Sequence, residues 1–79
     1  MAKRKLPGCE DAGIAFYEWA SSLQAAADDD PKESCKGILG LEKAARAILQ
    51  EFNCSDIKVN FLDEYDDILK ECRKTGVWP

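Results

Sequence analysis

Apolar residues recur at spacings of three and four along most of this chain, and this pattern constrains its fold more than any other feature. Such spacing places side chains on one face of an α-helix. The pattern predicts helices over residues 10–27, 31–52 and 61–74. We therefore expect an all-α fold, a small three-helix bundle joined by short loops.

The first predicted helix carries its apolar residues in a single stripe. Its members are Ala12, Phe16, Trp19, Ala20, Leu23, Ala26 and Ala27. Since a stripe of this kind faces the core of a small domain, we expect Trp19 to be buried. Its truncation to Ala should then cost about 2–5 kcal/mol.

The second predicted helix has the clearest boundary in the chain, because Asp30 can cap it and Pro31 suits its first position. Its expected buried stripe is Cys35, Ile38, Leu41, Ala45, Ile48, Leu49 and Phe52. Truncation of Ile48 should also cost about 2–5 kcal/mol. Gly37 and Gly40 either break this helix or allow another helix to approach closely. We expect one continuous helix with close packing.

In residues 54–59 apolar and polar side chains alternate, and Asn60 follows as a possible helix cap. Ile57 and Val59 are the apolar members, as in a strand, but no second strand is available for pairing. We therefore predict a short extended connector that packs Ile57 and Val59 against the helices. The last helix should bury Phe61, Leu62, Tyr65, Ile68, Leu69 and Cys72 and end at Gly76.

The length of 79 residues indicates one domain. We assign it to residues 9–79, preceded by a flexible basic tail over residues 1–8. A domain of this size buries only about 60% of its unfolded surface, so its core alone is marginal. A staple, a partner or a homodimer would add stability.

The charge distribution disfavours contact with nucleic acid. The net charge is −4, with 11 basic and 15 acidic residues; removing Lys3, Arg4 and Lys5 leaves 8 against 15, a net of −7 for residues 6–79. A phosphate backbone repels such a body. No apolar run approaches the roughly 20 residues of a membrane span. With no secretory signal after the basic start, we expect a soluble, cytoplasmic protein, although a mature secreted product with a new Met would look the same.

The sequence lacks the residues of common catalytic and cofactor sites. It contains no histidine, which removes the commonest general base and metal ligand. A phosphate-binding loop and an EF-hand loop are also missing. We expect neither enzymatic activity nor a bound metal or cofactor.

The four cysteines have no pair at the two-residue spacing of zinc and redox motifs. Helices running up, down and up place Cys9 near Cys54 and Cys35 near Cys72, at poles roughly 25 Å apart, too far for one metal centre. In a reducing cytoplasm we expect four free thiols. In an oxidising compartment the same neighbours would form two bridges.

Several surface features are candidates for partner binding. Glu64, Asp67 and Glu71 lie at spacings of three and four and form an acidic strip, which is either a solvated helix face or a contact for a basic partner. The tail with Trp78 either folds back or projects as an anchor, since Trp is frequent at interface hot spots. Tyr17 is not covered by a stripe, and a glycine face permits close approach. The candidate partner-binding residues are Glu64, Asp67, Glu71, Trp78, Tyr17, Gly37 and Gly40.

These observations predict a small acidic protein-interaction module, such as an adaptor, an inhibitor or a regulatory subunit, whose partner is another protein. One alternative is a mobile-element inhibitor that uses an acidic surface to block a nucleic-acid-binding enzyme. Another is a disulfide-stapled or thiol-redox small protein.

Overall fold

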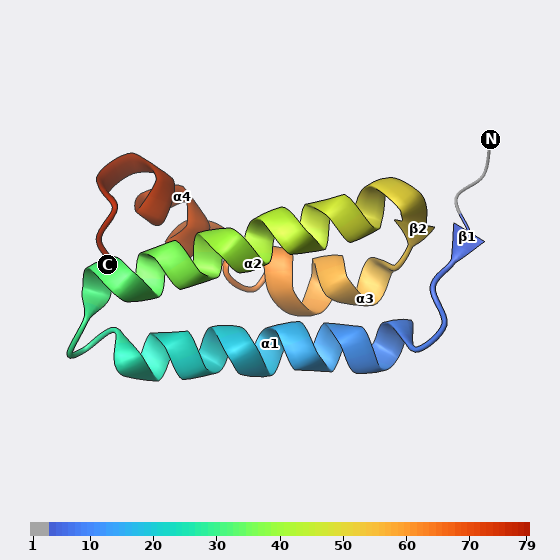
Figure 1. Cartoon of the computed structure of the whole chain (residues 1–79), viewed down its shortest axis with the longest axis horizontal. Helices are drawn as coiled ribbons and strands as arrows, with labels where there is room; N and C mark the ends of the chain where they lie inside the picture. Colours follow the sequence, from blue (N-terminus) through green and yellow to red (C-terminus); the bar gives the residue numbers. More distant parts are fainter. Residues whose placement is uncertain (1–3) are drawn as a thin grey trace.

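The computed structural model describes residues 4–79, which are predominantly helical, as predicted (Figure 1). The elements are β1 (Arg4–Lys5), α1 (Cys9–Ala26), α2 (Pro31–Glu51), β2 (Phe52–Asn53), α3 (Ser55–Ile57), the π-helical turn η1 (Lys58–Leu62) and α4 (Asp66–Thr75). The first two long helices match the predicted ones to within a residue. The third divides into several elements, so the predicted three-helix bundle is not confirmed.

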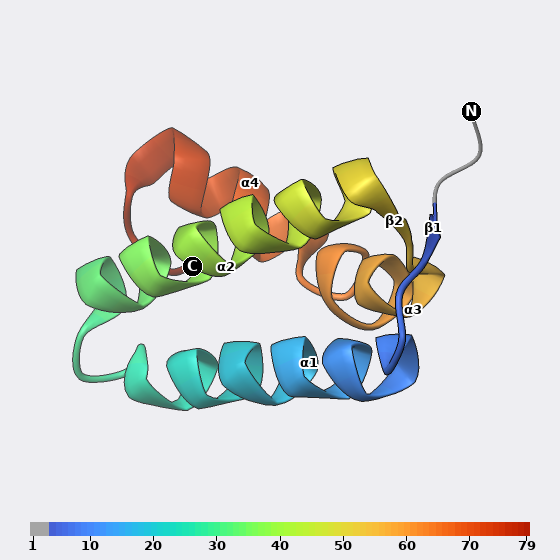
Figure 2. The ribbon, with the colours of Figure 1, turned by 45° about the vertical axis from the view of Figure 1, so that its right-hand side comes forward.

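The long helices α1 and α2 run antiparallel and form one layer (Figure 1). The remaining helical elements pack against one side of this layer, α3 and η1 on α1 and α4 on α2 (Figure 2). The Cα trace measures 42 × 22 × 15 Å. The layer of α1 and α2 is therefore covered on one side, and its other side forms the face shown in Figure 1.

The second helix begins as its sequence predicts. The Asp30 side chain accepts a hydrogen bond from the Glu33 backbone N–H at 3.4 Å, and Pro31 occupies the first helical position. The helix continues unbroken through Gly37 and Gly40. A Cβ atom on Gly37 would lie 2.8 Å from a Leu23 methyl carbon, so the expected close packing occurs there. A Cβ atom on Gly40 would have no side chain or other element within 4 Å.

The prediction of an extended connector is wrong. Residues 55–62 are helical, with Ile57 fully buried and Val59 56% exposed. The reason is a spacing of four that places Ile57, Phe61 and Tyr65 on one buried side. The chain then turns over residues 63–65, so the last helix begins at 66 rather than 61.

The core lies between the α1–α2 layer and the elements that cover it. Its most buried members are Phe16, Ala20, Cys35, Ile38, Ala45, Cys54, Ile57, Phe61, Leu69 and Cys72. Trp19 is 53% exposed, so its predicted burial is wrong, and Ile48 is only half-buried. Each residue lies at the edge of the apolar stripe of its own helix, and both stripes are wider than the surface that α3, η1 and α4 cover.

The chain near its start pairs with the segment that follows α2. Arg4 and Lys5 lie parallel to Phe52 and Asn53 in a two-stranded ladder, and the Arg4 guanidinium lies 5.4 Å from the centre of the Phe52 ring. Part of the predicted basic tail is thus packed on the domain, whereas residues 1–3 lie outside the described region. The flexibility of residues 1–8 stays a prediction.

Two disulfides join the helices, so the expectation of four free thiols is wrong. Cys9 bonds to Cys54 and Cys35 to Cys72, with Cα–Cα distances of 5.6 and 5.3 Å. The predicted neighbours, Cys9 with Cys54 and Cys35 with Cys72, are confirmed. The expectation of free thiols depended on an assumed reducing compartment, whereas the fold itself brings each pair within bonding distance.

Candidate interaction surface

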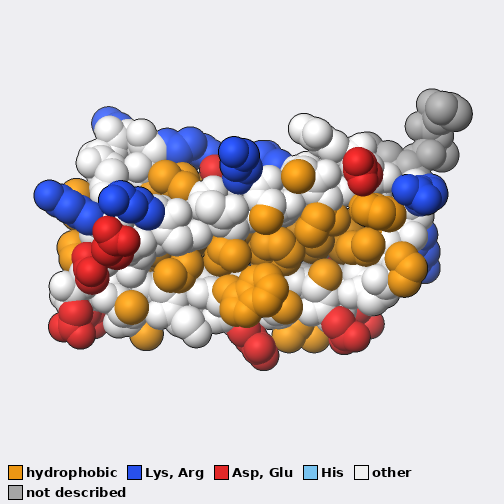
Figure 3. All heavy atoms as spheres, viewed as in Figure 1, with side chains coloured by type: hydrophobic (Ala, Val, Ile, Leu, Met, Phe, Trp, Pro, Cys, Tyr) orange, Lys and Arg blue, Asp and Glu red, His pale blue; other side chains and the backbone are white. Residues whose placement is uncertain are grey.

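The uncovered edges of the α1 and α2 stripes meet on one face of the molecule. Figure 3 shows hydrophobic side chains gathered along the boundary between the two helices. We call this surface the apolar band, and the helical period assigns to it Ala15, Trp19, Ser22 and Leu23 of α1 and Gly37, Leu41, Ala44 and Ile48 of α2. All of these residues are exposed or half-buried.

Trp19 dominates the apolar band. Its ring packs edge-on against Phe16, with 5.4 Å between centroids, while about half of the side chain faces solvent. Beside it lies an open hollow of about 380 Å³, lined by Trp19, Ser22, Leu23, Gly37 and Leu41. Gly37 helps to shape this hollow, because a side chain there would meet Leu23. The surface thus offers a large apolar side chain next to a mainly apolar recess.

The charges beside the apolar band are unevenly distributed. Helix α1 contains the acids Glu10, Asp11 and Glu18 and no Lys or Arg. Asp11 and Glu18 are seven residues apart, so they follow the solvent-facing edge of the Ala15–Trp19 stripe. Along α2 both signs occur, as in the exposed ion pair of Glu33 with Lys36 at 3.4 Å. The α1 edge is therefore purely acidic (Figure 3).

Tyr17 faces another side of α1, and its surface meets the edge of the apolar band at Glu18. It is 45% exposed and, with Ile14, Glu18 and Asn60, lines a second recess of about 320 Å³. Its ring lies 6.0 Å from that of Tyr65. Since Tyr17 and Trp19 point to nearly opposite sides of α1, a single flat contact cannot use both.

Tyr65 is buried next to Tyr17. Burial, and to a lesser extent the neighbouring Tyr17, raise the pKa of the Tyr65 phenol above its ordinary value of 10.0, while a hydrogen bond with Ser21 opposes the rise. The hydroxyl therefore remains protonated throughout the neutral range.

The predicted acidic strip is divided between two structural elements. Asp67 and Glu71 lie one turn apart on α4, whereas Glu64 lies in the turn before that helix. Glu64 and Asp67 are exposed and Glu71 is half-buried. The strip is not part of the apolar band, because α4 packs on the side of α2 that carries Cys35. Its role as a partner contact stays a prediction.

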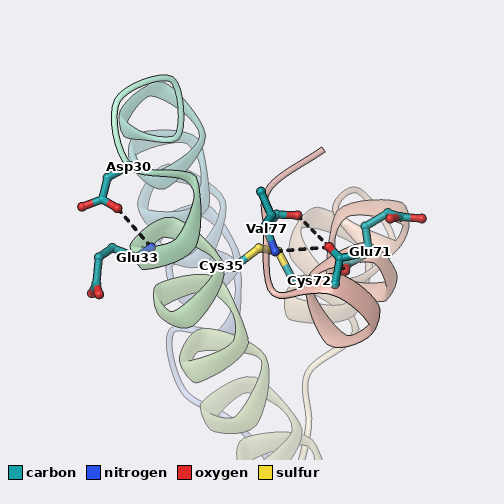
Figure 4. Close-up of a disulfide and its surroundings, with 7 residues drawn as sticks. Asp30, Glu33, Cys35, Glu71, Cys72 and Val77 are labelled. Carbon is teal, nitrogen blue, oxygen red and sulfur yellow. Dashed lines mark hydrogen bonds between the residues drawn. A yellow bond between two sulfur atoms is a disulfide. The ribbon is translucent and has the colours of Figure 1, made fainter.

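The C-terminal tail folds back onto the start of α2. The Trp78 backbone N–H donates to the Pro31 carbonyl at 3.3 Å, and the Trp78 side chain is half-buried against the core. Thr75 supports the turn, since its hydroxyl accepts a hydrogen bond from the Val77 N–H at 3.2 Å beside the Cys35–Cys72 disulfide (Figure 4). Of the two arrangements expected for Trp78, the structure shows the folded-back one.

A partly buried ionic cluster was not predicted from the sequence. Glu42 is 7% exposed and accepts hydrogen bonds from Arg46 Nε at 3.2 Å, from Arg46 Nη2 at 3.0 Å and from Arg73 Nη1. The Glu42–Arg46 pair has the four-residue spacing of helical ion pairs and was detectable in the sequence. The contact with Arg73 joins α2 to α4 and depends on the fold.

Within residues 4–79 no group of three or more potential ligands could hold a metal ion. In the same part of the chain, no helix combines the length and apolarity that a bilayer crossing needs. Comparison of the chain with protein-family models, with curated proteins and with solved structures finds no match. The surfaces described above are therefore the basis for a functional proposal.

Proposed function

We propose that this chain is a protein-interaction module without catalytic chemistry, and that it binds another protein through the apolar band. The observation that supports this proposal is Trp19, which exposes about half of a large apolar side chain beside the hollow lined by Leu23 and Leu41. Contiguous exposed apolar surface of this kind is typical of binding sites, and Trp is enriched among the residues that dominate binding energy. An adaptor, an inhibitor and a regulatory subunit all act through such a contact.

The disulfides favour a stapled protein of an oxidising compartment. Bridges of this kind persist in secreted and periplasmic proteins and are rare in the cytoplasm, so we propose an oxidising location in place of the cytoplasmic one expected from the sequence. A structural role suits them better than a redox role. The side chains of Cys35, Cys54 and Cys72 are no more than 2% exposed, which hinders attack by an external thiolate.

Capture of the partner from the native source, with matched variants as bait, tests the proposed contact. Trp19→Ser removes most of the exposed apolar side chain. A second bait reverses the acidic strip through Glu64→Lys, Asp67→Lys and Glu71→Lys. We expect the partner to be retained by the wild type and by the strip variant and to be lost from Trp19→Ser.

Circular dichroism controls for folding, since both variants alter exposed or half-buried side chains and should keep the wild-type helical signal. The opposite result, with binding lost only when the strip is reversed, would transfer the contact to α4. It would also support the alternative of an acidic surface that blocks a nucleic-acid-binding enzyme.

A further inference from the structure

We infer that the occupant of the apolar band is a cationic amphipathic α-helix of the partner protein. This inference rests on the proposed function and specifies the chemistry of the partner. It follows from the arrangement of α1 and α2 and from the charges that border them.

The shape of the apolar band suits a helix. The hollow beside Trp19 opens between α1 and α2, and we take it as the groove that a partner helix would enter. The elements α3, η1 and α4 cover only the opposite side of the layer (Figures 1 and 2). A helix placed in the open groove would complete a bundle around the α1–α2 pair. The apolar band is about 12 Å long on α1, from Ala15 to Leu23, and about 16 Å long on α2, from Gly37 to Ile48, which matches two to three turns of a partner helix.

The side chains of the groove allow a helix backbone to approach closely. Ala15, Ser22, Gly37 and Ala44 are the small members of the apolar band, and Ser22 and Gly37 line the hollow beside the larger Trp19. Packing of ridges into grooves needs this alternation of small and large residues. A large apolar residue of the partner would fill the hollow of about 380 Å³ beside Trp19.

The two edges of the groove differ in charge. The α2 edge carries both signs, as in the pair of Glu33 with Lys36, so only the acidic α1 edge favours a partner of one sign. The α1 edge carries Asp11 and Glu18 and no compensating Lys or Arg, so Lys or Arg along the flank of the partner helix would meet carboxylates there. A second copy of this chain fits less well. Its own α1 has no basic residue to offer, and each copy carries a net charge of −4.

Two synthetic helical peptides of about 18 residues test the inference. Both present the same Leu and Ala face, but one has Lys along its flanks and the other has Glu. Isothermal titration calorimetry on the intact protein should show the Lys peptide binding at least about tenfold more tightly than the Glu peptide, with a difference that shrinks as salt is added. Asp11→Lys combined with Glu18→Lys should remove or invert this preference.

Tryptophan fluorescence locates the binding. Trp78→Phe leaves Trp19 as the single tryptophan, and its emission should shift to shorter wavelength when the Lys peptide covers it. If Trp78→Phe fails to fold, fluorine NMR of the wild-type protein labelled with 5-fluorotryptophan gives the same information for each residue. Trp19→Ser should abolish binding of the Lys peptide while retaining the helical dichroism.

Equal affinity for the two peptides, or binding that leaves Trp19 unchanged, overturns the inference. So does a concentration-dependent dimer that buries Trp19 in the absence of peptide, because a second copy would then occupy the band. Failure of the inference is separable from failure of the proposed function. If Trp19→Ser still loses the captured partner although neither peptide binds, the apolar band is the contact and only its occupant has been misassigned.

Discussion

Loss of either disulfide should destabilise the domain by an amount that follows from the loop it closes. The bridges Cys9–Cys54 and Cys35–Cys72 span 45 and 37 residues. Closure entropy for loops of these lengths corresponds to about 4 kcal/mol for each bridge at 25 °C. The two lengths differ too little to separate the bridges by more than a few tenths of a kcal/mol, because the entropy depends on the logarithm of length.

The perturbation is paired substitution, Cys35→Ala with Cys72→Ala and, separately, Cys9→Ala with Cys54→Ala. Alanine avoids placing a hydroxyl at these mostly buried positions. A domain of this size has a total stability of roughly 4–12 kcal/mol, so either variant should be weakened severely or unfolded.

Guanidinium unfolding followed by circular dichroism measures the free energy of unfolding of each variant and of the wild type. A loss below about 1 kcal/mol in both variants would refute the loop argument. A large loss in one variant and a small loss in the other would show that local packing around one bridge, rather than chain entropy, determines the effect. The same measurement on the wild type with a reductant should reproduce the larger destabilisation of losing both bridges.

Three further predictions concern the helical core. Gly13→Ala should destabilise the domain by about 1–3 kcal/mol, because the new Cβ would lie 2.9 Å from the Asp56 carbonyl oxygen. Gly40→Ala, with open space around it, should instead stabilise α2 by up to about 1 kcal/mol. Thermal unfolding of the two variants compares these effects. Glu42→Gln should lower the free energy of unfolding by about 1–2 kcal/mol, since it weakens charge-assisted hydrogen bonds with two half-exposed arginines. A double-mutant cycle with Arg73→Ala should show coupling between Glu42 and Arg73. Stability losses that simply add would contradict this contact. Because folding raises the pKa of Tyr65, the contribution of the Tyr65 phenol to stability is complete below the ordinary pKa of 10.0 and is lost as the pH rises through the folded pKa. Chemical unfolding measured from pH 9 upward should show this fall in the free energy of unfolding. Tyr65→Phe should make the fall smaller.

The sequence predicted the two long helices because their signals are local. Asp30 and Pro31 mark the start of α2, and the spacing of apolar residues fixes the length of both helices. The pairing of cysteines was also predictable, since antiparallel helices of known length determine which ends meet. The oxidation state was not, because it depends on the compartment as well as on the fold.

The main error in the prediction from sequence was the width of the buried face of α1 and α2. Periodicity shows which side of a helix is apolar, but the share of that side that becomes buried depends on what packs against it. Here α3, η1 and α4 cover the sides of α1 and α2 that carry Gly13 and Glu42, and leave Trp19 and Ile48 at the opposite edge. The residue assigned to the core is thus the one that now defines the candidate site. Of the residues predicted to bind a partner, only Gly37 lies in the apolar band.

The order in which the cysteines pair keeps the fragments of a cleaved chain covalently joined. Along the sequence the bonds alternate, first cysteine with third and second with fourth. A protease that cleaves once anywhere between Cys9 and Cys72 therefore leaves two fragments that are still joined by at least one disulfide. After a second cleavage, all fragments that contain a cysteine remain joined. Separation requires three cuts, one in each interval between successive cysteines. Had neighbouring cysteines paired instead, a single cut between Cys35 and Cys54 would have released two independent halves.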